Sequence, residues 1–184
     1  MNRPAHVASH APFAGFTATE FLRVVDSGAL GDCRVELVQG EIVKMMPSYL
    51  AHGEANMRVG ASLLPLFAGT ARVAVDLMIV TGVDTIRAVD LAVVRPDAPS
   101  DRPVSPADVI LAIEIAASSL AQDLGAKLVD YAAAGIATYW VVDLESQVVH
   151  AMRSPEGDTY RNRQVVRFGE PLQVPGTGAS IVVA

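Results

Sequence analysis

The stretch Ile86-Arg-Ala-Val-Asp-Leu-Ala-Val-Val94 decides the predicted fold. It is dense in β-branched and small apolar residues, and it carries an acid near its middle. A similar run from Val109 to Ala117 follows a proline-rich loop, and another from Arg72 to Val80 precedes it. Runs of this composition are typical of strands that are buried on both faces. Together they predict the centre of a β-sheet.

Two helices and a hairpin are expected before these strands. Thr17 and Glu20 have the spacing of a capping box, which predicts a short helix ending near Gly28. The runs 34–38 and 41–46, joined by Gln39-Gly40, predict a hairpin. Ser48 offers an N-cap for a helix over residues 49–67, which Pro65 can shorten or kink. Its apolar residues at helical spacing are Leu50, Met57, Leu63, Leu64 and Phe67.

A further helix and several strands are expected after the central runs. Ser118 or Ser119 can cap a helix that ends at Gly135, with apolar residues at Leu120, Leu124, Leu128 and Tyr131. Strands are predicted over residues 138–142, 147–152, 159–168 and 180–183. The predicted fold class is α/β, or α+β, with a mixed β-sheet flanked by helices and additional antiparallel strands.

Length and composition favour one globular domain. The chain has 184 residues, of which 51% are hydrophobic, so it can bury a sizeable core. We expect a loose tail over residues 1–12, without the pattern of a signal peptide, and a single domain over residues 13–184. No apolar run reaches the roughly 18 residues of a membrane span, which indicates a soluble protein.

The single cysteine, Cys33, excludes an internal disulfide framework and a multi-cysteine zinc site. A chain with so little cysteine suits the reducing cytoplasm. We expect Cys33 to be a buried small hydrophobe, because no histidine lies near it in sequence to activate the thiol.

Three charged residues are predicted to face the interior. Strand alternation places Asp90 among the apolar side chains of its run, and Glu114 is the only charge in its run after Asp108. At about 100° per residue, Lys127 falls inside the apolar stripe of the helix after Ser119. A buried, unpaired charge is costly, so these residues are expected to converge on one another or on a metal.

Such a cluster suits phosphodiester hydrolysis. Two carboxylates from adjacent strands are hard oxygen ligands of the kind that Mg²⁺ or Mn²⁺ prefers. A metal held by Asp90 and Glu114 can activate water and offset charge on a phosphate. Lys127 could then orient that water or stabilise the transition state.

The order of these residues resembles the PD-(D/E)XK nuclease superfamily, and within it the Uma2 family of restriction endonucleases. The resemblance spans nearly the whole chain. It rests on residues 35–41, His52, Val89-Asp90, Ile113-Glu114-Ile115, Asp123 with Lys127, and most specifically Tyr131 to Asp143. Two departures stand out: Val89 replaces the usual proline, and residues 116–119 lack the usual Ser-Pro-Ser-Thr pattern.

The resemblance implies a metal-dependent endonuclease acting on DNA. It assigns the metal-ligand positions to Asp90 and Glu114, and the catalytic lysine to Lys127, displaced onto the helix because Ala116 occupies the usual place. Glu36 matches an acid that serves as an additional ligand or supporting group, and His52 matches a histidine at the start of the long helix. Asp123 accompanies Lys127 as an auxiliary residue.

Structural alternatives stay open for each of these residues. The three charges could form a buried ion-pair network without catalysis, and Asp123 with Lys127 an ordinary i,i+4 helix pair. Glu36 could pair with a cation in the hairpin, and His52 could be a hydrogen-bonding residue at the helix start. Tyr139-Trp140 is expected in the core, although an aromatic near a cleft can stack on a base.

The charge distribution favours a second hypothesis, a non-catalytic dimeric binding or assembly module. The net charge of −6 argues against a large nucleic-acid footprint. The best basic stripe alternates along one predicted strand and commonly marks a solvated face: Arg161, Arg163 and Arg167. Residues 53–60 contain glycines without a nucleotide-binding pattern. A homodimer is expected under either hypothesis.

Overall fold

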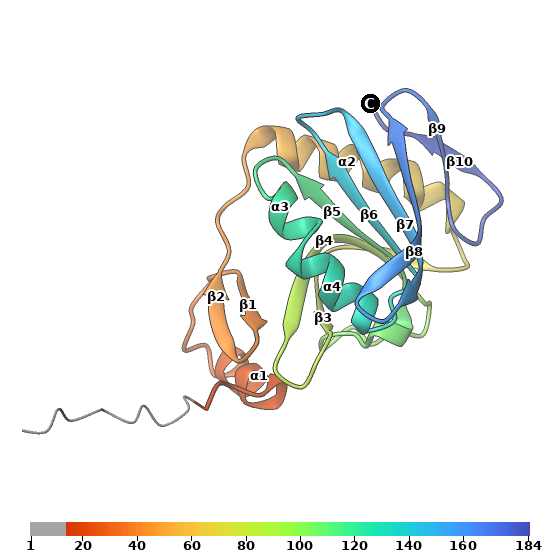
Figure 1. Cartoon of the computed structure of the whole chain (residues 1–184). Coiled ribbons are helices and arrows are strands. Elements are labelled where there is room, and N and C mark those ends of the chain that lie inside the picture. The colour runs from red at the N-terminus through yellow and green to blue at the C-terminus, as the bar shows by residue number, and fades with distance from the viewer. Residues whose placement is uncertain (1–13) are drawn as a thin grey trace, which may run out of the picture.

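The central strands form at the apolar runs that predicted them. The protein, described here over residues 14–184 by a computed structural model, has an eight-stranded sheet in that part of the chain, with helices on both faces (Figure 1). The predicted tail over residues 1–12 lies outside the described residues. The elements are α1 (Ala18–Asp26), β1 (Val35–Val38), β2 (Glu41–Lys44), α2 (Leu50–Leu63), η1 (Leu64–Leu66), β3 (Arg72–Val80), β4 (Ile86–Val94), η2 (Pro106–Asp108), β5 (Val109–Ala116), α3 (Leu120–Asp123), α4 (Ala126–Ala133), β6 (Thr138–Asp143), β7 (Val148–Glu156), β8 (Thr159–Arg167), β9 (Pro171–Gln173) and β10 (Ser180–Val182).

The sheet is mixed, as predicted. Its order is β2-β1-β4-β5-β6-β7-β8, and β3 pairs with the other edge of β4. Strands β5 and β6 are parallel, while the remaining pairs in this sheet are antiparallel. A crossover connection is therefore needed between β5 and β6, and α3 and α4 supply it.

One edge of β4 is shared between two strands. Ile86, at its start, pairs with Leu37 of β1, whereas residues 91–94 pair with β5. Between these contacts the sheet forks, and no strand within residues 14–184 pairs with that edge of β4. Buried backbone groups need hydrogen bonds, so side chains must satisfy them in the fork. The site described below lies here.

Each face of the sheet packs against its own helix. On one face, Val59 and Leu63 of α2 pack with Leu91, Ile113 and Trp140. On the other, a second cluster joins α4 to the sheet through Leu128, Tyr131, Ala112, Tyr139 and Val141. Two apolar faces, each covered by a helix, explain why β4 and β5 are apolar on both sides.

The N-terminal elements confirm the local signals in the sequence. Thr17 and Glu20 form the predicted capping box at the start of α1. Gln39 and Gly40 both have positive φ, 51° and 82°, as a two-residue hairpin turn requires. The backbones of Gly40 and Gly15 are so close that a Cβ on either would lie 2.8 Å from the other's Cα. The hairpin is thereby fixed to the start of the described chain.

The structure corrects the predicted burial of β3 and α2. Strand β3 is an edge strand with exposed and half-buried residues, because only β4 pairs with it along its length. Of the apolar residues predicted for the helix over 49–67, Leu63 and Phe67 are buried, but Leu50, Met57 and Leu64 are exposed. The cap of α2 is Tyr49, without a side-chain hydrogen bond, so Ser48 does not cap it.

Other corrections concern chain breaks and an overlooked strand. The helix predicted from Ser119 to Gly135 divides into α3 and α4 at Gly125, where an added Cβ would lie 2.6 Å from the Ala121 carbonyl oxygen. Strand β9, three residues beginning with a proline, had no alternating pattern to predict it. Cys33 is exposed and not buried. No helix within residues 14–184 is long and apolar enough to cross a membrane.

Candidate active site

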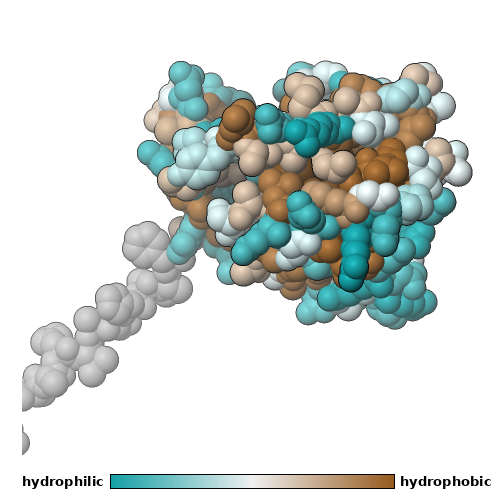
Figure 2. All heavy atoms as spheres, turned by 90° about the horizontal axis from the view of Figure 1, so that it is seen from above, coloured by the Kyte–Doolittle hydropathy of each residue, from teal (hydrophilic) through white to brown (hydrophobic). Residues whose placement is uncertain are grey.

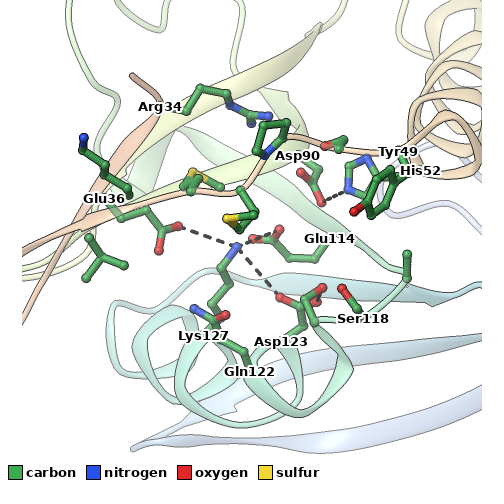
Figure 3. Close-up of a pocket in the computed structure, with 18 residues that line it drawn as sticks. Arg34, Glu36, Tyr49, His52, Asp90, Glu114, Ser118, Gln122, Asp123 and Lys127 are labelled. Carbon is green, nitrogen blue, oxygen red and sulfur yellow. Dashed lines mark hydrogen bonds and ion pairs between the residues drawn. The ribbon is translucent and has the colours of Figure 1, made fainter. Parts of the chain in front are cut away.

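A cavity of about 450 Å³ opens beside the fork in the sheet. Asp90 of β4, Glu114 of β5 and Lys127 of α4 all line it, so the structure brings together the three residues that the sequence singled out. One wall is the end of β2 with residues 45–49, and another is the 117–119 turn with α3. Figure 3 shows the carboxylates and the ammonium directed into this space.

Asp90 is held as a carboxylate. Its Oδ2 accepts a hydrogen bond from the Ile115 backbone N–H at 2.8 Å and lies 3.1 Å from His52 Nε2. Burial opposes ionisation, but these two bonds outweigh it and lower the pKa of Asp90. Within residues 14–184, the hydrogen bonds to this carboxylate all use Oδ2, which leaves Oδ1 available to a ligand in the cavity.

Glu114 is almost completely buried, with 1% exposure. Burial raises its pKa well above the ordinary value, and the nearby acids Asp90 and Asp123 raise it further. The Tyr131 hydroxyl donates to Oε1 at 2.7 Å, and Lys127 Nζ lies 2.9 Å from Oε2. Charge at Glu114 is therefore costly without a cation, and Lys127 supplies one.

Lys127 remains an ammonium. Burial alone would lower its pKa, but Glu114, Glu36 and Asp123 together hold the pKa above its ordinary value. Nζ lies 3.6 Å from Glu36 Oε1 and 3.8 Å from Asp123 Oδ1. These two acids act in addition to Glu114, so the charge of Lys127 does not depend on Glu114 alone. A charged lysine cannot act as a base, so its chemistry here is electrostatic.

Glu36 joins Lys127 to a second buried cation. Its Oε2 accepts from Arg87 Nη1 at 2.9 Å, and its Oε1 accepts from the Ala88 backbone N–H at 2.9 Å. Arg87, 1% exposed, also bonds Asp130 of α4 at 2.7 Å. The partner of Glu36 is thus on β4 and not in the hairpin. Both oxygens are occupied, which favours a supporting role for Glu36.

Asp123 and His52 lie on opposite sides of the cavity. Asp123 is buried, accepts from Ser119 Oγ at 2.5 Å, and has a pKa raised chiefly by burial. Its i,i+4 pair with Lys127 exists, but it is one of three acids around the ammonium. His52, in the first turn of α2, has its pKa raised chiefly by the hydrogen bond to Asp90. It reaches into the site and does not cap the helix.

Sequence reasoning missed several residues that shape the site. Arg87 was the one charge left unexplained in a buried strand, and the argument applied to Asp90 and Glu114 would have found it. Asn56 donates to the Asp90 carbonyl oxygen at 3.2 Å, one helical turn after His52. Tyr131 was assigned to the apolar stripe, yet its hydroxyl bonds Glu114. A polar tip on an otherwise apolar residue gives no periodic signal.

Other sequence candidates lie away from the site. Tyr139 and Trp140 are core residues with at most 1% exposure, so neither can stack on a base. Arg161, Arg163 and Arg167 are exposed on β8, and Arg161 is paired with Glu156. The stripe is therefore a solvated face, as its alternation suggested.

The residues at the fork fit a magnesium-type site better than a closed one. Within residues 14–184, no group of three or more His, Cys, Asp or Glu side chains is arranged to hold a metal ion. Structural zinc needs four such ligands, whereas Mg²⁺ uses one or two carboxylates and completes its shell with water and substrate phosphate. Asp90 and Glu114, on adjacent strands and lining one cavity, meet the smaller requirement.

The mixed sheet and its crossover helices form a nuclease-like fold of the restriction-endonuclease class. The chain belongs to the Uma2 family, described as "Putative restriction endonuclease", which matches residues 18–184. A solved structure described as "a putative nuclease belonging to DUF820 from Anabaena variabilis" is 19% identical with a TM-score of 0.68, and the alignment covers 91% of this chain and 95% of that one. At that identity the likeness shows the fold alone. No curated protein matches this chain.

Proposed function

We propose that the protein is a Mg²⁺-dependent endonuclease that hydrolyses DNA phosphodiester bonds. The observation that carries this proposal is the meeting of Asp90, Glu114 and Lys127 in one cavity, with Lys127 Nζ 2.9 Å from Glu114 Oε2. Membership of a family of restriction endonucleases supports it. The exposed Cys33 thiol supports a reducing compartment, the cytoplasm.

Asp90 and Glu114 would hold the divalent metal, Mg²⁺ or Mn²⁺. When bound, the metal supplies positive charge for the scissile phosphate and an activated water. Asp90 is ionised beforehand, because His52 and the Ile115 N–H stabilise its carboxylate. Glu114 ionises at greater cost, so the cation compensates for the burial of this residue in particular.

Lys127 would stabilise the phosphate as negative charge develops on it. The ammonium is already desolvated and oriented by three acids, so it needs little reorganisation in the transition state. Glu36 and Asp123 hold Lys127 from two sides, while His52 and Asn56 hold Asp90 from α2. Each reacting group thus has its own support.

A cleavage assay tests the assignment. Plasmid, linear duplex and single-stranded DNA are incubated with Mg²⁺, Mn²⁺ or EDTA and with wild-type protein, Asp90→Ala, Lys127→Ala or Arg161→Ala. Removal of one transition-state contact typically lowers kcat by about 10²–10³-fold, so we expect such a loss in the first two variants. Arg161 forms an exposed pair away from the cavity, and its variant should match wild type. Equal activity in all four proteins would refute the assignment.

Calorimetry separates this proposal from a non-catalytic binding or assembly module. Wild-type protein titrated with Mg²⁺ or Mn²⁺ should bind, and Glu114→Ala should abolish the binding. A wild-type protein that neither binds these ions nor cleaves any DNA form would favour the module, with the buried charges serving only as an ion-pair network.

A further inference from the structure

The outer face of α2 carries a row of exposed apolar side chains. Leu50, Met57 and Leu64 are 78%, 73% and 56% exposed. They recur at seven-residue intervals, which places them on one stripe of the helix. Isolated apolar residues on a surface are ordinary, but an aligned row that no element within residues 14–184 covers indicates a contact surface. Figure 2 shows the side of the molecule that includes α2, with hydrophobic residues gathered on it.

This stripe is separate from the candidate active site. His52 and Asn56, which bond Asp90, lie on the inner face of α2, and Val59 and Leu63 pack into the core. The row of Leu50, Met57 and Leu64 points the other way. None of these three residues lines the cavity, so a partner on the outer face can be tested independently of the proposed catalysis.

The stripe has the pattern of a surface that fits a copy of itself. It is symmetric about Met57: Leu50 and Leu64 are equidistant from it in sequence, and the small residues Gly53 and Ala61 are four positions away on either side. In an antiparallel helix pair related by a two-fold axis at Met57, Leu50 meets Leu64 of the partner copy, and Gly53 meets Ala61. A two-fold interface requires such self-complementarity.

The charges beside the stripe show the same self-complementarity. Glu54 and Arg58 follow one flank of the row, with side chains 53% and 64% exposed. In an antiparallel pair the same flank of each helix faces its counterpart, so Glu54 of one copy lies beside Arg58 of the other. In a parallel pair opposite flanks of the two helices meet, so Glu54 of one copy would lie on the opposite side of the interface from Arg58 of the other. Charge pairing at such flanking positions sets partner and orientation.

We propose that the protein forms a homodimer through antiparallel packing of its two α2 helices, centred on Met57. Exposed Val182, in the C-terminal strand beside Ala61 and Arg58, extends the apolar surface at its edge. The occupant of this face is a second copy of the chain, because apolar row, small residues and flanking charges all fit the same two-fold arrangement.

Light scattering coupled to gel filtration tests the dimer across a dilution series of the full chain. Wild type should elute at twice the monomer mass. Met57→Arg places two arginines at the two-fold axis and should raise the dimer Kd by about 100-fold or more. Leu50→Arg, at the end of the stripe, should also weaken the dimer. Val83→Arg is the matched control, because Val83 is 83% exposed in the turn between β3 and β4.

A charge exchange tests the orientation. Glu54→Arg alone should weaken the dimer through repulsion with Arg58 of the partner copy, and Arg58→Glu alone should do so through Glu54. The double variant restores opposite charges across the axis and should recover dimerisation. A monomeric wild type, a dimer that survives both Met57→Arg and Leu50→Arg, or a double variant no better than the single ones would each overturn the proposal. Circular dichroism checks that every variant is folded.

Discussion

Glu114, which we propose as a metal ligand, is a residue whose charge the fold disfavours. Its burial raises its pKa well above the ordinary value, so the metal-free protein holds the carboxylate only with help from Lys127. Placing acids where their ionisation costs stability is common at functional sites. A ligand that neutralises this charge should therefore stabilise the fold.

We expect Mg²⁺ to stabilise wild-type protein but not Glu114→Gln. At a concentration of 100 Kd, binding to the native state adds about 2.7 kcal/mol to the free energy of unfolding. The glutamine variant keeps the shape of the side chain and loses the ligand charge. Urea denaturation with Mg²⁺ or with EDTA measures the free energy of unfolding of wild type and of Glu114→Gln. A Glu114→Gln protein that gains as much as wild type would mean that the ion binds elsewhere.

His52 should make the stability of the metal-free protein depend on pH. Its pKa in the fold is raised above the ordinary value of 6.5, chiefly by the hydrogen bond to Asp90. The protonated form is thus favoured in the native state, and its contribution is fully present below pH 6.5 and lost as the pH rises through the raised pKa. His52→Gln should remove this component. Thermal melts in EDTA between about pH 5 and pH 9 bracket the transition, and an identical profile in the variant would contradict it.

Among the secondary-structure elements, Arg87 links three through ion pairs: β1, β4 and α4. It bonds Glu36 of β1 and Asp130 of α4 from its own strand, β4, at the point where no strand among the described residues pairs with the β1 and β5 edge of β4. Sequence patterns predicted the strands but not this tie, because periodicity reports which side chains face inward and not which of them meet across the fold. The sequence shows that Arg87 is a charge in a buried strand, but it does not show that Glu36 and Asp130 are its partners.

Arg87→Met should destabilise the protein by about 3–5 kcal/mol, because removal of one member of a buried ion pair leaves the others unpaired. Arg161→Ala breaks an exposed pair and should cost at most about 1 kcal/mol. Urea denaturation of both variants gives the comparison. Equal effects would mean that the Arg87 network does not hold β1, β4 and α4 together.

Gly125 separates α3 from α4 and so sets where Lys127 enters the cavity. Gly125→Ala should cost about 1–3 kcal/mol, since the new Cβ would lie 2.6 Å from the Ala121 carbonyl oxygen. Gly53→Ala is the matched control in α2, where a Cβ meets nothing within 4 Å. That change should stabilise the helix by about 0.5–1 kcal/mol. Thermal melts show whether each variant is less or more stable than wild type. A Gly125→Ala protein more stable than wild type would show that α3 and α4 can form one continuous helix.

At the scale of the molecule, much of the fold could be predicted because its central strands are unusually uniform. The runs containing Asp90 and Glu114 could only be buried strands, and the inward position of Lys127 followed from helical spacing. The fork between β1 and β5 could not be predicted, since it depends on pairing between distant segments. The exposure of Leu50 and Met57 could not be predicted either. An apolar stripe indicates only that a helix face will be covered, and does not say whether the core or another chain covers it.

The overall charge predicts a small DNA footprint. Of the cations lining the cavity, Lys127 is surrounded by acids and Arg34 is paired with Asp76, which leaves Lys44 at the rim. With Lys44 as roughly one phosphate contact, the logarithm of the binding constant should fall linearly with the logarithm of the salt concentration, with a slope of about −1. Fluorescence anisotropy with a labelled duplex and Lys127→Met, which should not cleave it, measures the slope. A slope near −5 would indicate a basic surface beyond the cavity.

At the fork in the sheet, side chains of the site also form hydrogen bonds with backbone groups that have no strand partner there within the described part of the chain. Ala88 N–H is satisfied by Glu36, the Asp90 carbonyl by Asn56, and Ile115 N–H by the Asp90 carboxylate. Loss of these side chains would leave buried backbone groups unpaired, which costs about 1–3 kcal/mol each. In a lineage that had abandoned catalysis, selection for folding would still retain Glu36 and Asp90. Conservation of Glu36 and Asp90 among its descendants would then reflect the needs of folding. Only the conservation or loss of Lys127 and Glu114 would indicate whether catalysis is retained.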